Sequence, residues 1–218
     1  MSDTQKVVNY TNLAKLKLKS GFIFKKLRDP SVDVEREVMD FINSQKSDFN
    51  KKVSNNFDIE TEDFQKFEFF TVDKRAKKIN DTSDMVDGSA VLFRAQARAT
   101  ILYLKPRSLI IFQTNYDFAI TEPGCGGNGI MYQSGGRNYE LEEIYFNKIT
   151  TVGALHDEDT YKVLEEGCGK GGETTFTSEF DGFVIRAGEN FKVFASDRNL
   201  QELKDARKMI NEKISQTN

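Results

Sequence analysis

The sequence contains no tryptophan, one histidine and two cysteines among 218 residues. His156 is therefore the only histidine that can serve as a general base. Structural zinc sites take four nitrogen or sulfur ligands at compact spacing, whereas His156, Cys125 and Cys168 supply three that are far apart in the sequence. These shortages exclude most histidine-based catalysis, and we expect no metal and no other cofactor.

Long apolar runs are also absent. No stretch of about 18 apolar residues occurs, so we expect no transmembrane helix. The first residues, "MSDTQKVVNYTNLAKLKLKSGFIF", lack the continuous apolar segment and small-residue cleavage site of a secretory signal peptide. We therefore expect a cytoplasmic protein whose thiols are reduced.

Aromatic and charged side chains are abundant. Eighteen phenylalanines and seven tyrosines supply the core of one large domain or two small ones. Residues 1–30 carry seven Lys or Arg against two acids, and residues 139–166 carry eight acids against two lysines. The basic arm either touches an anionic membrane or nucleic acid, or is a solvated element balanced by an acidic face. The acidic second half argues against nucleic acid.

The first half of the chain predicts helices. In "DPSVDVEREVMDFINSQKSDFNKKV" (29–53), core-facing residues recur every three or four positions, as on one face of a helix. They are Val34, Val38, Phe41, Ile42, Gln45, Phe49 and Val53. Phe64, Phe67 and Phe70 give a second, shorter stripe. Residues 79–89 predict a linker, so residues 1–80 form a helical N-terminal region.

The second half predicts antiparallel strands and a final helix. β-Branched and aromatic residues fill 98–121 on both sides of Pro106, and six short runs of similar texture follow. Residues 187–190, "AGEN", predict the last hairpin turn. The closing helix has an apolar face and, at Asn199 and Glu202, capping-box spacing. The face consists of Leu200, Leu203, Ala206, Ile210 and Ile214.

This order of elements predicts an α+β fold. Over residues 90–218 we expect an antiparallel β-barrel or sandwich, one end of which the terminal helix caps. The order, with "IYFNKITTVG" and "FKVFASDRNLQELKDARKMINEKI", resembles the pleckstrin-homology-like domains of many small bacterial proteins over roughly residues 90–215. The resemblance implies a scaffold for binding or assembly, usually without catalysis. Exposed sheet edges and hairpin loops could pair with another protein or with a second copy of this chain.

The resemblance also implies a ligand site. In phosphoinositide-binding members of the family, basic residues near the first hairpin contact the ligand. Here that hairpin is "YLKPRS", which offers Lys105 and Arg107, with Arg98 on the preceding strand. The alternative is a plain exposed turn.

Two glycine-rich hexapeptides, "GCGGNG" (124–129) and "GCGKGG" (167–172), each hold one cysteine. Neither lies between a strand and a helix, as a phosphate-binding loop does, and Lys170 lacks the following Ser or Thr. Cys168, near Lys170, is the one candidate nucleophile, with a small residue in a turn as the alternative. We predict that both hexapeptides connect strands.

Three functional hypotheses follow. The first is a non-enzymatic binding or assembly module. The second is peripheral membrane association through the basic N-terminal arm and the Lys105/Arg107 turn, in which residues 12–27 form an amphipathic helix or an edge strand. The third is an enzyme that uses Cys168 as its nucleophile.

Overall fold

The computed structural model describes residues 11–16, 31–76, 85–86, 88–121, 129–165, 172–195 and 199–217. The elements are β1 (Thr11–Leu16), α1 (Ser31–Ser44), α2 (Lys46–Phe57), η1 (Thr61–Asp63), β2 (Gln65–Ala76), β3 (Met85–Val86), β4 (Ser89–Leu104), β5 (Ser108–Thr121), β6 (Gly129–Tyr145), η2 (Phe146–Lys148), β7 (Thr151–Glu165), β8 (Gly172–Ala187), β9 (Glu189–Ala195) and α3 (Leu200–Thr217). The predicted α+β class is confirmed.

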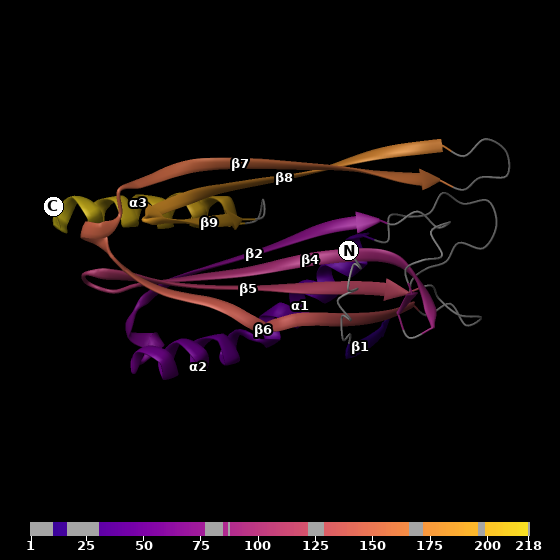
Figure 1. Cartoon of the computed structure of the whole chain (residues 1–218), viewed down its shortest axis with the longest axis horizontal. Coiled ribbons are helices and arrows are strands. Elements are labelled where there is room, and N and C mark those ends of the chain that lie inside the picture. The colour runs from indigo at the N-terminus through magenta and orange to yellow at the C-terminus, as the bar shows by residue number, and fades with distance from the viewer. Residues whose placement is uncertain are drawn as a thin grey trace, which may run out of the picture.

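The strands form two antiparallel sheets. The first has the order β1-β6-β5-β4-β2, with β3 paired to β4, and the second has the order β7-β8-β9. Figure 1 shows that α1 and α2 lie on one side of the first sheet, and that the second sheet and α3 lie on the other. The first sheet is therefore the middle layer of three. Within the described residues, no pair of hydrogen-bonded strands joins the two sheets into a closed barrel.

The predicted helix over 29–53 exists, but it is broken into α1 and α2 at Gln45. At the break, the Ser44 hydroxyl donates a hydrogen bond to the Phe41 carbonyl over 2.6 Å. A hydroxyl that bonds back to the preceding turn competes with the helical ladder. Four of the seven predicted core positions are confirmed as fully buried against the first sheet: Val38, Ile42, Phe49 and Val53. Phe41 and Gln45 are partly buried, and the side chain of Val34 is outside the described part of the structure.

The second predicted helix is wrong, because its residues form β2. This strand pairs with β4 along its whole length, from Gln65 to Ala76. Phe67 and Phe69 face the second sheet, whereas Phe70 faces α1 and α2. Phe67, Glu68 and Phe69 alternate as a strand does, but Phe70 is buried on the opposite face, and the three-residue spacing of Phe67 and Phe70 is also that of a helix. The region predicted as helical over 1–80 thus contains two strands of the first sheet, β1 and β2.

The segment predicted as a linker, 79–89, stands between two paired strands. β2 and β4 are antiparallel neighbours in one sheet. The segment that connects them is therefore not a linker between two separate parts of the fold. Most of this segment lies outside the described residues. The short β3 does belong to the fold, because Met85 pairs with Ala90 and Val86 with Ser89.

The strands predicted in the second half are confirmed and are longer than expected. The two runs around Pro106 are β4 and β5. Two of the six short runs, 148–155 and 160–165, are predicted as separate strands but fall within one strand, β7, from Thr151 onward. The turn predicted at 187–190 joins β8 to β9. Residues 129–138, although they contain three glycines, belong to β6.

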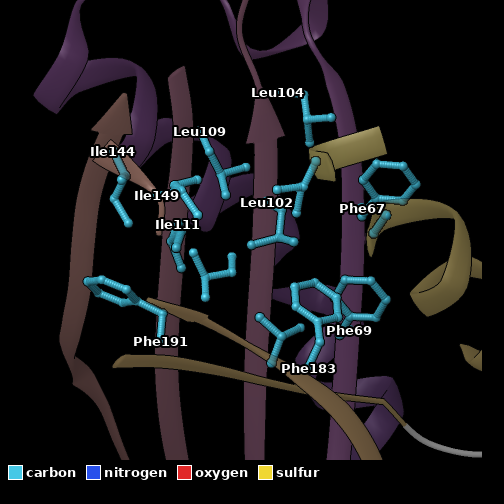
Figure 2. Close-up of a cluster of buried hydrophobic side chains, with 14 of the residues drawn as sticks. Phe67, Phe69, Leu102, Leu104, Leu109, Ile111, Ile144, Ile149, Phe183 and Phe191 are labelled. Atoms are coloured by element: carbon cyan, nitrogen blue, oxygen red, sulfur yellow. The ribbon is translucent and has the colours of Figure 1, made fainter. Parts of the chain in front are cut away.

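The two sheets and α3 share one apolar core. Figure 2 shows Leu102 and Ile111 of the first sheet on the same side as Phe183 and Phe191 of the second. The rings of Phe69 and Phe183 meet edge to face, with centroids 6.5 Å apart. The predicted apolar face of the last helix completes this core with three buried residues: Leu203, Ala206 and Ile210.

The start of α3 also covers the edge of β2. The backbone N–H of Glu68 donates to Glu202 Oε1 over 3.1 Å, and Asn199 Nδ2 donates to the Glu68 carbonyl over 3.1 Å. Asn199 also donates to Glu202 Oε2 over 3.3 Å. The two residues predicted as a capping box thus satisfy backbone groups of an edge strand that would otherwise offer a template for strand pairing.

Several predictions fall on residues whose structure is not described. Cys125, Cys168 and Lys170 lie outside the described residues, as do most of the N-terminal arm and most of 12–27. The described strands show that each hexapeptide connects antiparallel neighbours, β5 to β6 and β7 to β8. Within the described part of the chain, no helix combines the length and the hydropathy needed to cross a membrane.

Because both sheets share a core, we expect the described fold to unfold in one transition. Phe183→Ala should lower the free energy of unfolding by about 3–5 kcal/mol, since it leaves a cavity in the core between the two sheets. Urea denaturation followed by circular dichroism and by tyrosine fluorescence measures this. Tyr145→Ala is the control, because its side chain is 56% exposed and the expected change is within about 0.5 kcal/mol. Two separate transitions would contradict the shared core.

Candidate functional site

The turn predicted as a ligand site joins β4 to β5, and one of its two cations is paired. Lys105 Nζ lies 2.7 Å from Glu143 Oε1, which also accepts a hydrogen bond from the Ser108 hydroxyl over 2.6 Å. Arg107 is exposed, and its carbonyl accepts a hydrogen bond from the backbone N–H of Phe146 over 3.1 Å. Arg107 is therefore the cation that this turn offers to solvent.

Arg98 lies far from that turn. It is seven residues before Lys105 along β4, which corresponds to roughly 23 Å of extended strand. The structure therefore does not bring the three predicted ligand-binding residues together. The turn is also not the first hairpin of the first sheet, because β2 precedes β4 and pairs with it. The sequence pattern predicts a helix for the residues of β2. The turn expected to be the first hairpin of the sheet therefore comes one strand later.

Arg98 belongs instead to a row of polar side chains on β4 and β5, here called the polar ladder. Its six members face each other in three cross-strand pairs, Gln96 with Asp117, Arg98 with Asn115, and Thr100 with Gln113. Each pair is hydrogen bonded: Gln96 Nε2 donates to Asp117 Oδ1 (3.0 Å), Arg98 Nε to Asn115 Oδ1 (3.1 Å) and Gln113 Nε2 to Thr100 Oγ1 (3.1 Å). The ladder lies on the face that turns toward the second sheet.

The second sheet closes one end of the polar ladder and leaves the other accessible. Gln113 Nε2 also donates to the Lys192 carbonyl of β9 over 2.8 Å. Phe194 of β9 covers Arg98, with 5.4 Å from the guanidinium carbon to the ring centroid. Along β4, Thr100 is buried, Arg98 is half-buried and Gln96 is exposed. The ladder is thus anchored in the core and opens to solvent.

The chemistry of the polar ladder suits binding. Its members are three amides, one hydroxyl, one guanidinium and one carboxylate, so it contains no thiol or imidazole nucleophile. Its carboxylate, Asp117, accepts a hydrogen bond from Gln96. Across the described residues, no three His, Cys, Asp or Glu side chains are arranged to hold a metal ion. Amides and guanidinium groups recognise peptide groups and oxyanions.

A second polar cluster lies on the opposite face, at a glycine bulge in β6. Gly136 has a φ of 72°, and a Cβ there would collide with the ring of Tyr116. Lys52 pairs with Asp48 over 2.9 Å and lies over the ring of Tyr139, 5.1 Å from its centroid. Two adjacent glycines within a strand-like run were the signal in the sequence for this bulge.

This second cluster has a structural role. Burial, and then the negative charge of Asp48, raise the pKa of the Tyr116 phenol to about 12. A phenol this weakly acidic stays protonated near neutral pH and cannot serve as a general base there. Its ring packs edge to face on Phe41 of α1, with centroids 5.4 Å apart. The bulge therefore fits β6 around an aromatic core residue.

His156 lies on the hairpin of β7 and β8, among acids. It is paired in register with Asp181, and the Nδ1–Oδ1 distance is 2.9 Å. This hydrogen bond, together with the charges of Asp181, Glu179 and Glu158, raises the pKa of His156 above its usual value. The imidazole is exposed, so it has no shielded site in which to act on a substrate.

A proton titration can test the His156 pair, because the chain has one histidine. We expect its NMR signal to titrate above about pH 6.5, the usual value, and Asp181→Asn to bring the pKa down toward it. Because the folded pKa is raised, the stabilising pair is fully present below the unfolded pKa and is lost as pH rises through the folded pKa. An unchanged pKa in Asp181→Asn would contradict the pairing.

The Glu143 pair predicts the opposite dependence on pH. Burial by itself would raise the pKa of this carboxyl, but the hydrogen bonds from Lys105 and Ser108 and the charge of Lys105 lower it. Its stabilising contribution is therefore present above the unfolded pKa and is lost as pH falls through the folded pKa.

Glu143→Gln should accordingly be less stable than the wild type near neutral pH, and the difference should shrink below about pH 4. Urea midpoints measured at several pH values give this difference. Glu140→Gln is the matched control, because Glu140 is exposed on the same strand. If the difference in stability between the wild type and Glu143→Gln were the same at all pH values, the Lys105–Glu143 ion pair would not be its cause.

Comparison with known proteins adds no relative, since no family model, curated protein or solved structure matches this chain. The arrangement of the residues is therefore the basis on which a function is assigned. Among the described residues, the polar ladder is a row of side chains that is held in place by hydrogen bonds and is open to solvent at one end.

Proposed function

We propose that the protein is a non-enzymatic binding module that holds a protein partner on the polar ladder. The observation that carries this proposal is that side chains of the ladder are held by hydrogen bonds and are also exposed to solvent. Gln96 and Asn115 are exposed, yet their ladder neighbours hold both through cross-strand hydrogen bonds. Side chains fixed before binding lose little conformational entropy when a partner docks.

The order of the elements supports a pleckstrin-homology-like scaffold as part of this proposal. Four antiparallel strands (β2, β4, β5 and β6) are followed by three (β7, β8 and β9) and then by α3, whose apolar face packs into the core that the sheets share. This is the order that the resemblance implied, extended by β2 at its start. A scaffold of this kind presents binding surfaces on a rigid frame.

The other hypotheses have less support from the described residues. At the predicted membrane-binding turn, Lys105 is paired with Glu143, which lowers the positive charge available to anionic lipid. Most of the basic N-terminal arm and Cys168 lie outside the described residues, and the described part of the arm, Thr11–Leu16, is a strand paired with β6. We therefore place the partner on the polar ladder, and vesicle binding becomes one outcome of the test.

The test compares what the full chain retains from native lysate before and after the ladder is changed. Gln96→Leu/Asn115→Leu removes two exposed amides, so the expected loss of stability is small, about 1 kcal/mol or less. We expect this double variant to lose the partner that the wild type retains, as measured by quantitative mass spectrometry. Light scattering of the same samples shows whether the partner is a second copy.

Glu140→Gln/Glu142→Gln is the matched control, since both residues are exposed on the neighbouring strand β6. It should retain the partner at the wild-type level. The same recovery from wild type and from the ladder variant would show that partners dock elsewhere. Sedimentation with vesicles that contain phosphatidylserine, if Arg107→Ala abolished it, would favour the membrane role instead.

A further inference from the structure

We propose that Arg98 is a carboxylate-binding residue, and that its ligand is an acidic side chain or a terminal carboxylate of an extended peptide. This inference rests on the proposed function and names the chemistry of its partner. The inference starts from the observation that the Arg98 guanidinium has no carboxylate partner among the described residues. Within the described residues Arg98 has an amide and an aromatic ring as its polar and π contacts, and no Asp or Glu within ion-pair distance.

The unmet donors of Arg98 lie on its Nη atoms. A guanidinium has five N–H groups, of which the one on Nε is used by Asn115. The remaining four make the planar fork that matches the two oxygens of a carboxylate. Among the described residues no acceptor for them is present. A half-buried cation without a counter-charge is costly, so an anion from outside would be favoured there.

The guanidinium is also held in a fixed orientation. Asn115 holds its Nε edge, and its carbon lies over the ring of Phe194. Phe194 is itself positioned by the strand beside it. Gly182 lies opposite Phe194 in register, and a Cβ there would come within 3.1 Å of the Phe194 ring and collide with the Val193 carbonyl. This glycine therefore lets the ring stay where it covers Arg98.

The surroundings of Arg98 favour a carboxylate over a phosphate. Asp117 lies on the same face of the sheet, one cross-strand pair away, and adds a negative charge. One guanidinium beside one carboxylate suits a ligand with a single charge better than a dianionic phosphate. A carboxylate in a peptide also fits the neighbours, because the exposed amides of Gln96 and Asn115 can bond to peptide groups.

The geometry of a strand supports an extended ligand. Gln96 and Arg98 are two residues apart on β4 and point to the same face, so their side chains repeat at about 6.8 Å. An extended peptide repeats its own side chains at the same spacing. It can therefore place a carboxylate at Arg98 while its backbone lies beside Gln96.

The test is an NMR titration of the full-length protein, observing backbone amides and the Arg98 Nε–H signal. The probes are N-acetyl-threonyl-glutamyl-threonine amide, its glutamine analogue, N-acetyl-threonyl-glutaminyl-threonine with a free terminal carboxylate, and inorganic phosphate at equal ionic strength. We expect the glutamate peptide or the free-acid peptide to shift the Arg98 signal and the ladder amides, and the uncharged analogue not to do so. Comparing the two acidic peptides identifies the source of the carboxylate.

Variants then assign the effect to Arg98. Arg98→Gln should weaken binding about tenfold to a hundredfold, since a charge-assisted fork is lost. Arg98→Lys, which keeps the charge and loses the fork, should bind more tightly than Arg98→Gln and less tightly than wild type. Arg107→Gln is the control and should bind as the wild type does. Circular dichroism checks that each variant is folded.

Three outcomes would overturn the carboxylate site: equal shifts from the charged and uncharged peptides, shifts that persist in Arg98→Gln, or tighter binding of phosphate. The failure of the proposed function is distinguishable from these. If the peptides shift Arg98 while the lysate partner is retained by the ladder variant, the carboxylate site stands and only the docking of that partner on the ladder is wrong.

Discussion

Burial of the first sheet on both faces is the constraint on which the rest of the fold depends. Near the β4–β5 turn, every residue from Ile101 to Leu104 and from Ser108 to Phe112 is buried. Each large apolar side chain buried here contributes about 1.5–3 kcal/mol, and neither face alone accounts for the run. The sheet therefore needs two covers, which α1 with α2 and the second sheet with α3 provide.

The two covers differ in extent, and the polar ladder exists because of that difference. Further along β4, the positions that face α1 and α2 remain small and apolar at Ala95, Ala97 and Ala99. The positions between them, which face the second sheet, become Gln96, Arg98 and Thr100. One strand thus changes from apolar on both faces to alternating as its second cover gives way to solvent. The polar side chains hydrogen-bond to one another across β4 and β5. Gln113 also bonds to the second sheet.

The helix that closes the core also protects a sheet edge. α3 buries its apolar face between the sheets, and the residues at its start bond to the backbone of Glu68 on β2. The Lys46 ammonium pairs with the Glu68 side chain, so elements from both covers meet at one position of the edge strand. Edge strands with satisfied backbone groups do not recruit further strands at that point.

Local pattern by itself determined much of this protein. The amphipathic face of α1 and α2, the strands around Pro106, the turn at 187–190 and the apolar face of α3 follow from spacing and residue type, which act over short distances. Only the tertiary structure decided that Phe67, Phe69 and Phe70 form a strand, because Phe70 is buried on the second face and interrupts the alternation. It likewise decided that Arg98 lies beside Asn115 and Phe194 and far from Arg107. The register between strands, not proximity in sequence, fixes which side chains share a site.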